Sequence, residues 1–148
     1  MDRDAAMVGH WTSEPFDYGA MESSALALLP DGGGWTVYAS VSGTLSVTRF
    51  LWGCPRAGVL ELRMTRIVEG TRASRDDGGF ATVETDESCD EALRTGYAFD
   101  RVRGGDGAVV EAVRFEEPVE YCVLYARGDR RVTADQDPSW SVVGRDLP

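Results

Sequence analysis

The stretch SSALALLPDGGGWTVYASV, residues 23–41, decides the fold class of this chain. Its two arms, residues 23–29 and 35–41, are rich in apolar residues, and Pro30-Asp31-Gly32-Gly33-Gly34 lies between them. Proline presets φ for a turn, aspartate hydrogen-bonds the turn backbone, and glycine reaches positive φ without steric cost. In the second arm apolar and polar side chains alternate, which is the period of a half-buried strand. The stretch therefore predicts a β-hairpin.

Similar segments, separated by turn residues, follow one another along most of the chain. The expected strands span residues 7–13, 23–29, 35–41, 44–52, 59–68, 80–84, 97–103, 109–115 and 119–126. The pattern predicts an all-β fold, an up-and-down antiparallel β-barrel of about eight to nine strands, because closing such a sheet removes its two edges. We expect residues 1–132 to form this single domain, with residues 133–148 as a tail packed on or beside the barrel.

Three segments lack the strand pattern. Gly53-Cys54-Pro55 combines a glycine with a proline, which favours the end of a strand. Residues 70–88 are irregular apart from the short strand expected at residues 80–84, with Asp77-Gly78-Gly79 as its candidate hairpin tip, and the acidic residues within 76–91 indicate a solvated loop. Residues 91–94 are compatible with a helical turn.

Composition and charge argue against several classes of partner. The net charge of −10 disfavours nucleic acid, because phosphate binding needs a positive surface. The chain has no lysine, no asparagine and one isoleucine, which is typical of a GC-rich genome, so its arginines do not by themselves indicate phosphate recognition. No apolar run approaches the roughly 20 residues of a membrane-spanning helix, and the charged start leads into no apolar segment. We expect a cytoplasmic protein without a membrane partner.

The chain offers little material for a metal site or for nucleophilic catalysis. His10 is the only histidine, whereas a zinc site needs about three or four ligands. A Ser-His-Asp or Cys-His arrangement would have to use that same histidine. The three cysteines are expected as reduced thiols, with a disulfide between two of them left open. We expect no cofactor, and the sequence favours a non-enzyme, although Glu61, Tyr97 or Glu111 could serve an enzyme as acid or base.

The first and last expected strands carry a further pair of signals. Gly9-His10-Trp11 is a G-x-W motif, and Arg127 follows directly after Tyr125-Ala126. In these features, in its length and in its strand rhythm, the chain resembles the calycin group: lipocalins, fatty-acid-binding proteins and bacterial lipocalin-like relatives. The resemblance covers about residues 7–132 and implies a lipocalin-like, eight-stranded barrel.

In the calycin group, the motif's tryptophan closes the narrow end of the barrel and an arginine near the end of the last strand packs across it. The resemblance therefore assigns barrel closure to Gly9, Trp11 and Arg127, with Arg130 and Arg131 as alternatives to Arg127. The chain has neither the mid-chain Thr-Asp-Tyr motif of lipocalins nor the helical lid that fatty-acid-binding proteins insert after the first strand. It thus resembles the group rather than a named subfamily.

Aromatic residues are dense in the expected strands, and apolar walls with a few polar groups are typical of small-molecule sites. The candidate lining residues of the barrel are Tyr38, Phe50, Trp52, Arg114, Tyr121 and Tyr125. Three charged residues, Arg49, Arg114 and Glu111, share strand faces with apolar residues. In fatty-acid-binding relatives, inward arginines hold a ligand carboxylate. The alternative is that these residues face solvent or pair with an acid such as Glu61.

Two functions fit these observations. The first is a non-enzymatic protein that binds a small apolar or amphipathic ligand in the barrel interior. The second is an interaction or accessory protein with a filled barrel and no ligand, for which a homodimer is one form. The features to watch for the second are the acidic residues 76–91 and an exposed Trp140 in the tail.

Overall fold

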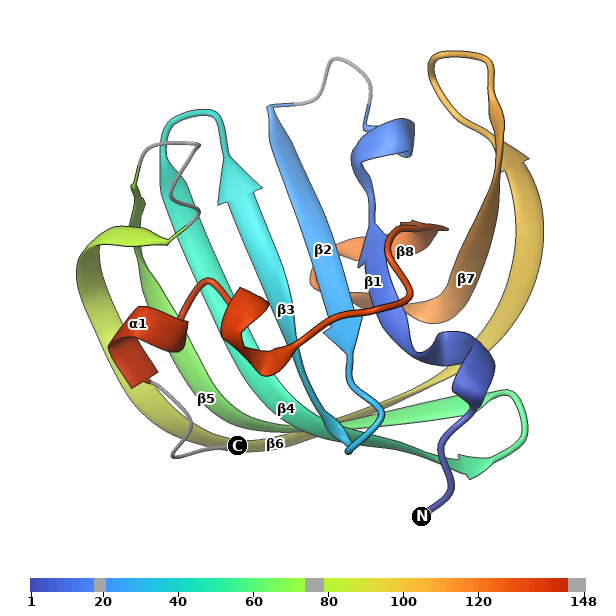
Figure 1. Ribbon diagram of the computed structural model, residues 1–148, viewed down its shortest axis with the longest axis horizontal. Coiled ribbons are helices and arrows are strands. Elements are labelled where there is room, and N and C mark those ends of the chain that lie inside the picture. The colour runs from blue at the N-terminus through green and yellow to red at the C-terminus, as the bar shows by residue number, and fades with distance from the viewer. Residues whose placement is uncertain (18–20, 74–78, 144–148) are drawn as a thin grey trace.

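The computed structural model describes residues 1–17, 21–73 and 79–143 (Figure 1). It contains eight strands: β1 (Gly9–Thr12), β2 (Glu22–Leu28), β3 (Gly33–Ser40), β4 (Thr44–Arg56), β5 (Val59–Arg72), β6 (Phe80–Arg103), β7 (Val109–Val119) and β8 (Cys122–Arg127). Each strand pairs antiparallel with the next, and β1 pairs with β8 through Trp11↔Arg127 and Thr12↔Ala126. The strands therefore form a ring, and the prediction of an all-β, up-and-down antiparallel sheet of about eight strands is confirmed.

The helical elements are short, and none of them is part of the ring of strands. They are η1 (Ala5–Met7), η2 (Glu14–Phe16), η3 (Ala134–Gln136) and α1 (Trp140–Val143). None of the helices in the described part of the chain is long and apolar enough to cross a membrane.

The hairpin at residues 23–41 forms as expected. β2 and β3 pair from Glu22↔Ser40 to Leu28↔Gly34. In the turn, Gly33 N donates to Asp31 Oδ1 at 2.8 Å, and Gly32 adopts a φ of 99°, which an L side chain rarely reaches. The prediction from the turn residues is confirmed.

β2 is apolar on both faces because each face meets a different core. Leu26 and Leu28 belong to an interior cluster whose members come from strands all around the ring. Ala27 and Leu29 belong to an outer cluster on the opposite face. The interior cluster consists of Met7, Trp11, Leu26, Leu28, Phe50, Trp52, Cys54, Leu60, Leu62, Val113, Phe115, Val119 and Tyr125, and the outer cluster of Ala27, Leu29, Trp35, Leu45 and Val47.

The segment after β8 packs on the outer face of the ring, where it crosses β1, β2 and β3 (Figure 1). Val132 packs against the outer cluster. Asp137 and Ser139 are buried, and Asp137 Oδ2 accepts from Arg49 Nε at 2.5 Å. Arg49 thus lies on the outer face and pairs with an acid of the tail. Trp140, expected to be exposed, is half-buried.

The expected strand break at residues 53–55 is wrong. β4 continues through Pro55 to Arg56, and the register against β5 shifts between Gly53 and Arg56. A bulge is one of the few places in a sheet that accept proline, since the missing N–H costs no ladder hydrogen bond there. Glycine and proline therefore mark a distortion inside this strand rather than its end.

The expected loop and helical turn before residue 97 are also wrong for the described residues. β5 extends to Arg72, and β6 runs for 24 residues from Phe80 to Arg103. Most β6 side chains up to Glu91 are exposed on both faces, so the segment has no buried face to impose an alternating pattern. Residues 76–78, which include part of the expected loop and hairpin tip, lie outside the described residues.

Candidate functional site

The N-terminal segment closes one end of the interior around Trp11. The indole is 1% exposed, and its Nε1 donates to Met7 O at 2.9 Å. The Arg127 guanidinium carbon lies 3.9 Å from the centre of the Trp11 ring, and its Nη1 donates to Val8 O at 2.8 Å. A second guanidinium nitrogen donates to Ala6 O. Arg127 thus combines a cation–π contact with hydrogen bonds that hold the N-terminal segment in place.

Gly9 is required where β1 meets the segment after β8. Its φ is 127°, and a Cβ there would lie 2.8 Å from Asp129 O. The structure therefore brings Gly9, Trp11 and Arg127 together at one place. Arg130 contacts Glu111 instead, with its Nη2 at 3.5 Å from Glu111 Oε2.

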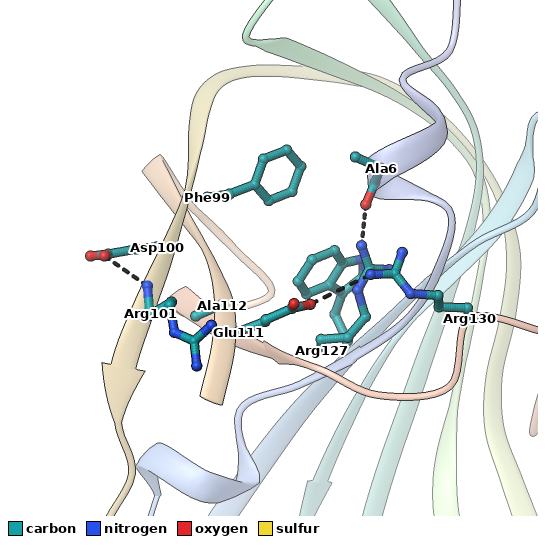
Figure 2. Close-up of a pocket in the computed structure, with 9 residues that line it drawn as sticks. Ala6, Phe99, Asp100, Arg101, Glu111, Ala112, Arg127 and Arg130 are labelled. Atoms are coloured by element: carbon teal, nitrogen blue, oxygen red, sulfur yellow. Dashed lines mark hydrogen bonds and ion pairs between the residues drawn. The ribbon is translucent and has the colours of Figure 1, made fainter. Parts of the chain in front are cut away.

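A pocket of about 570 Å³ opens beside this closure (Figure 2). It lies between η1, β1, the C-terminal part of β6, the start of β7 and the chain after β8. Phe99 is 47% exposed, and its ring stacks on Trp11 with centroids 6.1 Å apart. The lining residues are Ala6, Trp11, Phe99, Asp100, Arg101, Glu111, Ala112, Arg127 and Arg130.

The charges around this pocket are mostly positive. Arg101, Arg127 and Arg130 contribute three guanidinium groups, whereas the carboxylates are those of Glu111 and Asp100. The Asp100 carboxylate lies 3.6 Å from Arg114, which is outside the pocket lining. Arg101 makes no ion pair with a described residue.

Burial and the neighbouring Arg130 lower the pKa of Arg127, which Glu111 partly offsets. Among the described residues, the buried Nε of Arg127 has no hydrogen-bond partner.

Three of the six expected lining residues are packed into the interior cluster. Phe50, Trp52 and Tyr125 are all buried. Trp52 Nε1 donates to Leu29 O at 2.8 Å, and Tyr125 OH donates to Val119 O at 2.5 Å, so their polar atoms are satisfied within the protein. These side chains fill the part of the interior in which they lie.

The other three expected lining residues lie elsewhere. Tyr38 and Tyr121 form an edge-to-face pair with centroids 5.5 Å apart, and Tyr121 is 78% exposed. Tyr38 OH donates to Glu22 Oε2 at 2.5 Å. Arg114 is exposed on the outer side of β7, where it pairs with Asp100 rather than facing the interior. The six residues therefore do not form one site.

The pocket residues were only partly found by sequence reasoning. Trp11 and Arg127 were identified as closing residues, and Glu111 as a charge on a mixed face. Phe99 and Arg101 alternate along β6 and could have been placed on one face. This face of β6 meets η1 and the chain after β8, which are far from it in the sequence. Local alternation could therefore not predict the pocket.

The turn between β7 and β8 reaches across to β2 and β3. Ser24 Oγ donates to Glu120 O at 2.7 Å, and Thr36 Oγ1 donates to Glu120 Oε2 at 3.0 Å. Burial raises the pKa of Glu120, the hydrogen bond from Thr36 opposes this, and nearby Glu69 raises it further. Glu120 and Tyr121 both have positive φ, at 48° and 70°, so this turn stores backbone strain.

Replacing Glu120 by glutamine is expected to raise the melting temperature at pH 7. The raised pKa means that Glu120 binds its proton more tightly in the folded state than in the unfolded state, so the bound proton stabilises the fold. This stabilisation is present below the unfolded pKa near 4.5 and is lost as the pH rises through the folded pKa. Glutamine cannot ionise, and its amide oxygen can still accept from Thr36. Thermal unfolding of both proteins from pH 3 to pH 8 should show curves that converge at low pH. The matched control is E117Q, an exposed residue nearby, and an equal gain from E117Q would contradict the assignment.

The acid–base candidates do not gather into a catalytic group. Tyr97 OH donates to Asp4 Oδ2 at 2.8 Å, and burial together with this hydrogen bond raises the pKa of Tyr97. Glu61 pairs with Arg94 at 2.6 Å, and Glu111 lines the pocket. Burial lowers the pKa of His10, although Asp129 and Glu14 oppose the effect.

The structure also bears on metal binding and on the cysteines. Within residues 1–17, 21–73 and 79–143, no three His, Cys, Asp or Glu side chains are grouped as metal ligands. Cys54, Cys89 and Cys122 are free thiols.

Comparisons with models of known protein families, with curated proteins and with solved structures find no match to this chain. Function is therefore inferred from the geometry and charge of the chain's own residues.

Proposed function

We propose that this chain is a non-enzymatic, lipocalin-like binding protein for a small amphipathic anion, held in the pocket beside Trp11. The observation that carries the proposal is a positively charged pocket with an aromatic wall in a protein of net charge −10. A local excess of one charge inside a concave site concentrates ligands of the opposite charge. We place the protein in the cytoplasm, where its free thiols would stay reduced.

The shape of the pocket suits a ligand with two distinct ends. Its volume of about 570 Å³ falls within the range of small-molecule sites. The exposed face of Phe99 offers an apolar platform, and Arg101 and Arg130 offer planar donors for a carboxylate or sulfonate. Figure 2 shows Phe99 on one side of the pocket and the Arg127 and Arg130 side chains on the other.

The position of this site differs from the barrel interior that the sequence suggested. The packing of Phe50, Trp52 and Tyr125 leaves no room for a ligand where those side chains lie. The calycin-like assignment of the fold is supported by the eight antiparallel strands and by the contact of Arg127 with Trp11. In this proposal the ligand lies in the pocket that Trp11 and Arg127 line together with residues of η1 and β6.

The test is binding of 1-anilinonaphthalene-8-sulfonate, an aromatic anion, measured by isothermal titration calorimetry. N-phenyl-1-naphthylamine has the same rings without the sulfonate and is expected to bind more weakly. The double variant R101Q/R130Q should weaken binding of the anion roughly tenfold or more, since a hydrogen bond to a charged group contributes about 1.5–3 kcal/mol.

The matched control for this experiment is R63Q. Arg63 is an exposed arginine on β5 with a single acidic partner, Asp90, at 3.5 Å. R63Q should leave the affinity unchanged. Equal affinity for the two dyes, or equal loss in R63Q and in the pocket variant, would overturn the proposal.

A second candidate function is an interaction or accessory protein without a ligand. The observation that favours it is the filled interior cluster, which leaves the outer surface as the recognition element. Native mass spectrometry of freshly purified protein separates the two candidates. A reproducible small-molecule adduct supports the binding protein, and an adduct-free homodimer supports the alternative.

A further inference from the structure

The first part of β6 has a strand neighbour on one edge and none on the other among the described residues. From Phe80 to Gly96 it pairs with β5, in the register from Arg72↔Phe80 to Val59↔Gly96. β7 pairs with β6 only between Tyr97 and Arg103. Beyond that point Glu117 N donates to Thr95 Oγ1 at 2.9 Å, and the chain then turns toward Ser24 and Thr36. We call residues 80–93 the open edge.

The open edge is accessible. Most side chains of residues 80–93 are exposed, on both faces of the strand, and Val83 is 42% exposed. In an antiparallel pair, alternate residues direct their N–H and C=O groups away from the partner strand. On the open edge these groups have no strand to bond, which is the arrangement that accepts an added strand.

Charge decides which strand could be added. Five acidic residues lie between 84 and 91, and no basic residue lies among them. Two are neutralised from β5, because Asp86 pairs with Arg66 at 2.6 Å and Asp90 with Arg63 at 3.5 Å. The remaining three, Glu84, Glu87 and Glu91, make no ion pair with a described residue. A second copy of β6 would place carboxylates opposite carboxylates, which is unfavourable.

We propose that the open edge of β6 binds an extended, basic segment of another protein, which adds to the sheet as a ninth strand. Backbone hydrogen bonds to the free edge supply affinity, and lysine or arginine side chains beside Glu84, Glu87 and Glu91 supply selectivity. This site is separate from the pocket beside Trp11 and does not depend on the function proposed for it.

The experiment uses the full chain and the capped peptide TKVKTKVKT, which alternates basic and β-forming residues. Hydrogen–deuterium exchange with mass spectrometry should show slower exchange within residues 80–93 when the peptide is bound. The peptide TKPKTKPKT has the same charge but cannot form the strand ladder. Its affinity should therefore be lower by roughly tenfold or more. Affinity should also fall as salt is added.

Paired variants separate a specific edge from general attraction to an acidic protein. E84Q/E87Q should weaken binding of TKVKTKVKT several-fold, and E14Q/E117Q, two exposed acids elsewhere with the same change in charge, should not. Equal binding of the two peptides, no binding, or protection outside residues 80–93 would overturn the proposal. Protection of residues 80–93 that rises with protein concentration alone would instead assign the edge to a second copy of the chain.

Discussion

Replacing Trp11 by alanine is expected to lower the free energy of unfolding by about 3–5 kcal/mol, the usual cost of deleting a large buried aromatic side chain. The indole is 1% exposed, and it packs in the interior cluster. Its loss would also remove the platform under the Arg127 guanidinium and the hydrogen bond to Met7 O. Because stable domains have only about 5–15 kcal/mol in total, the variant should be close to unfolding at 37 °C. Urea denaturation followed by circular dichroism measures the change.

The controls for this prediction separate volume from the specific contacts. W11F keeps an aromatic ring under Arg127 but has no indole N–H, so it should lose less stability than W11A. R127Q removes the cation and should fall between wild type and W11A, because the interior remains filled. A loss of about 0.5 kcal/mol or less for W11A, the range of ordinary surface changes, would show that this contact does not hold the N-terminal segment in place.

Replacing Asp137 by asparagine is expected to lower the free energy of unfolding by about 3–5 kcal/mol, the cost of removing one partner of a buried ion pair. The Arg49 and Asp137 side chains are 8% and 3% exposed, and they join β4 to the tail at 2.5 Å. Asparagine keeps the shape but takes the negative charge away from a buried guanidinium. Urea denaturation gives the loss, and limited proteolysis should show faster cleavage near residues 133–143.

Two further variants make this prediction specific. D135N changes an exposed acid in the same segment and should alter stability by about 0.5 kcal/mol or less. R49M/D137L replaces both charges by apolar groups and should recover part or all of the loss, because burying a charge pair carries a desolvation cost of its own. If D137N and D135N behave alike, the tail is not anchored by this pair.

The candidate site shows why the residues that line a pocket are harder to predict than the residues that form a strand. Phe50, Trp52 and Tyr125 were chosen as large aromatic residues in expected strands, and all three are buried in the interior cluster. Alternation indicates which residues face inward, but it does not indicate whether the inward space is full or empty. The residues of the pocket, Phe99 and Arg101 among them, gather only where η1 and the chain after β8 come beside β6.

The sequence by itself determined the features that depend on neighbouring residues. The β2–β3 hairpin and the antiparallel up-and-down order of the strands follow from turn residues and a two-residue period, and both act over a few positions.

Only the tertiary structure decided what covers each strand. Arg49 lies on the outer face and is buried because Asp137, far along the chain, packs over it. The part of β6 between the expected strands 80–84 and 97–103 was mistaken for a loop and a helical turn, because most of its side chains are exposed on both faces and no buried face leaves a pattern in its residues. Burial at a position depends on segments distant in sequence, and local periodicity does not indicate where those segments pack.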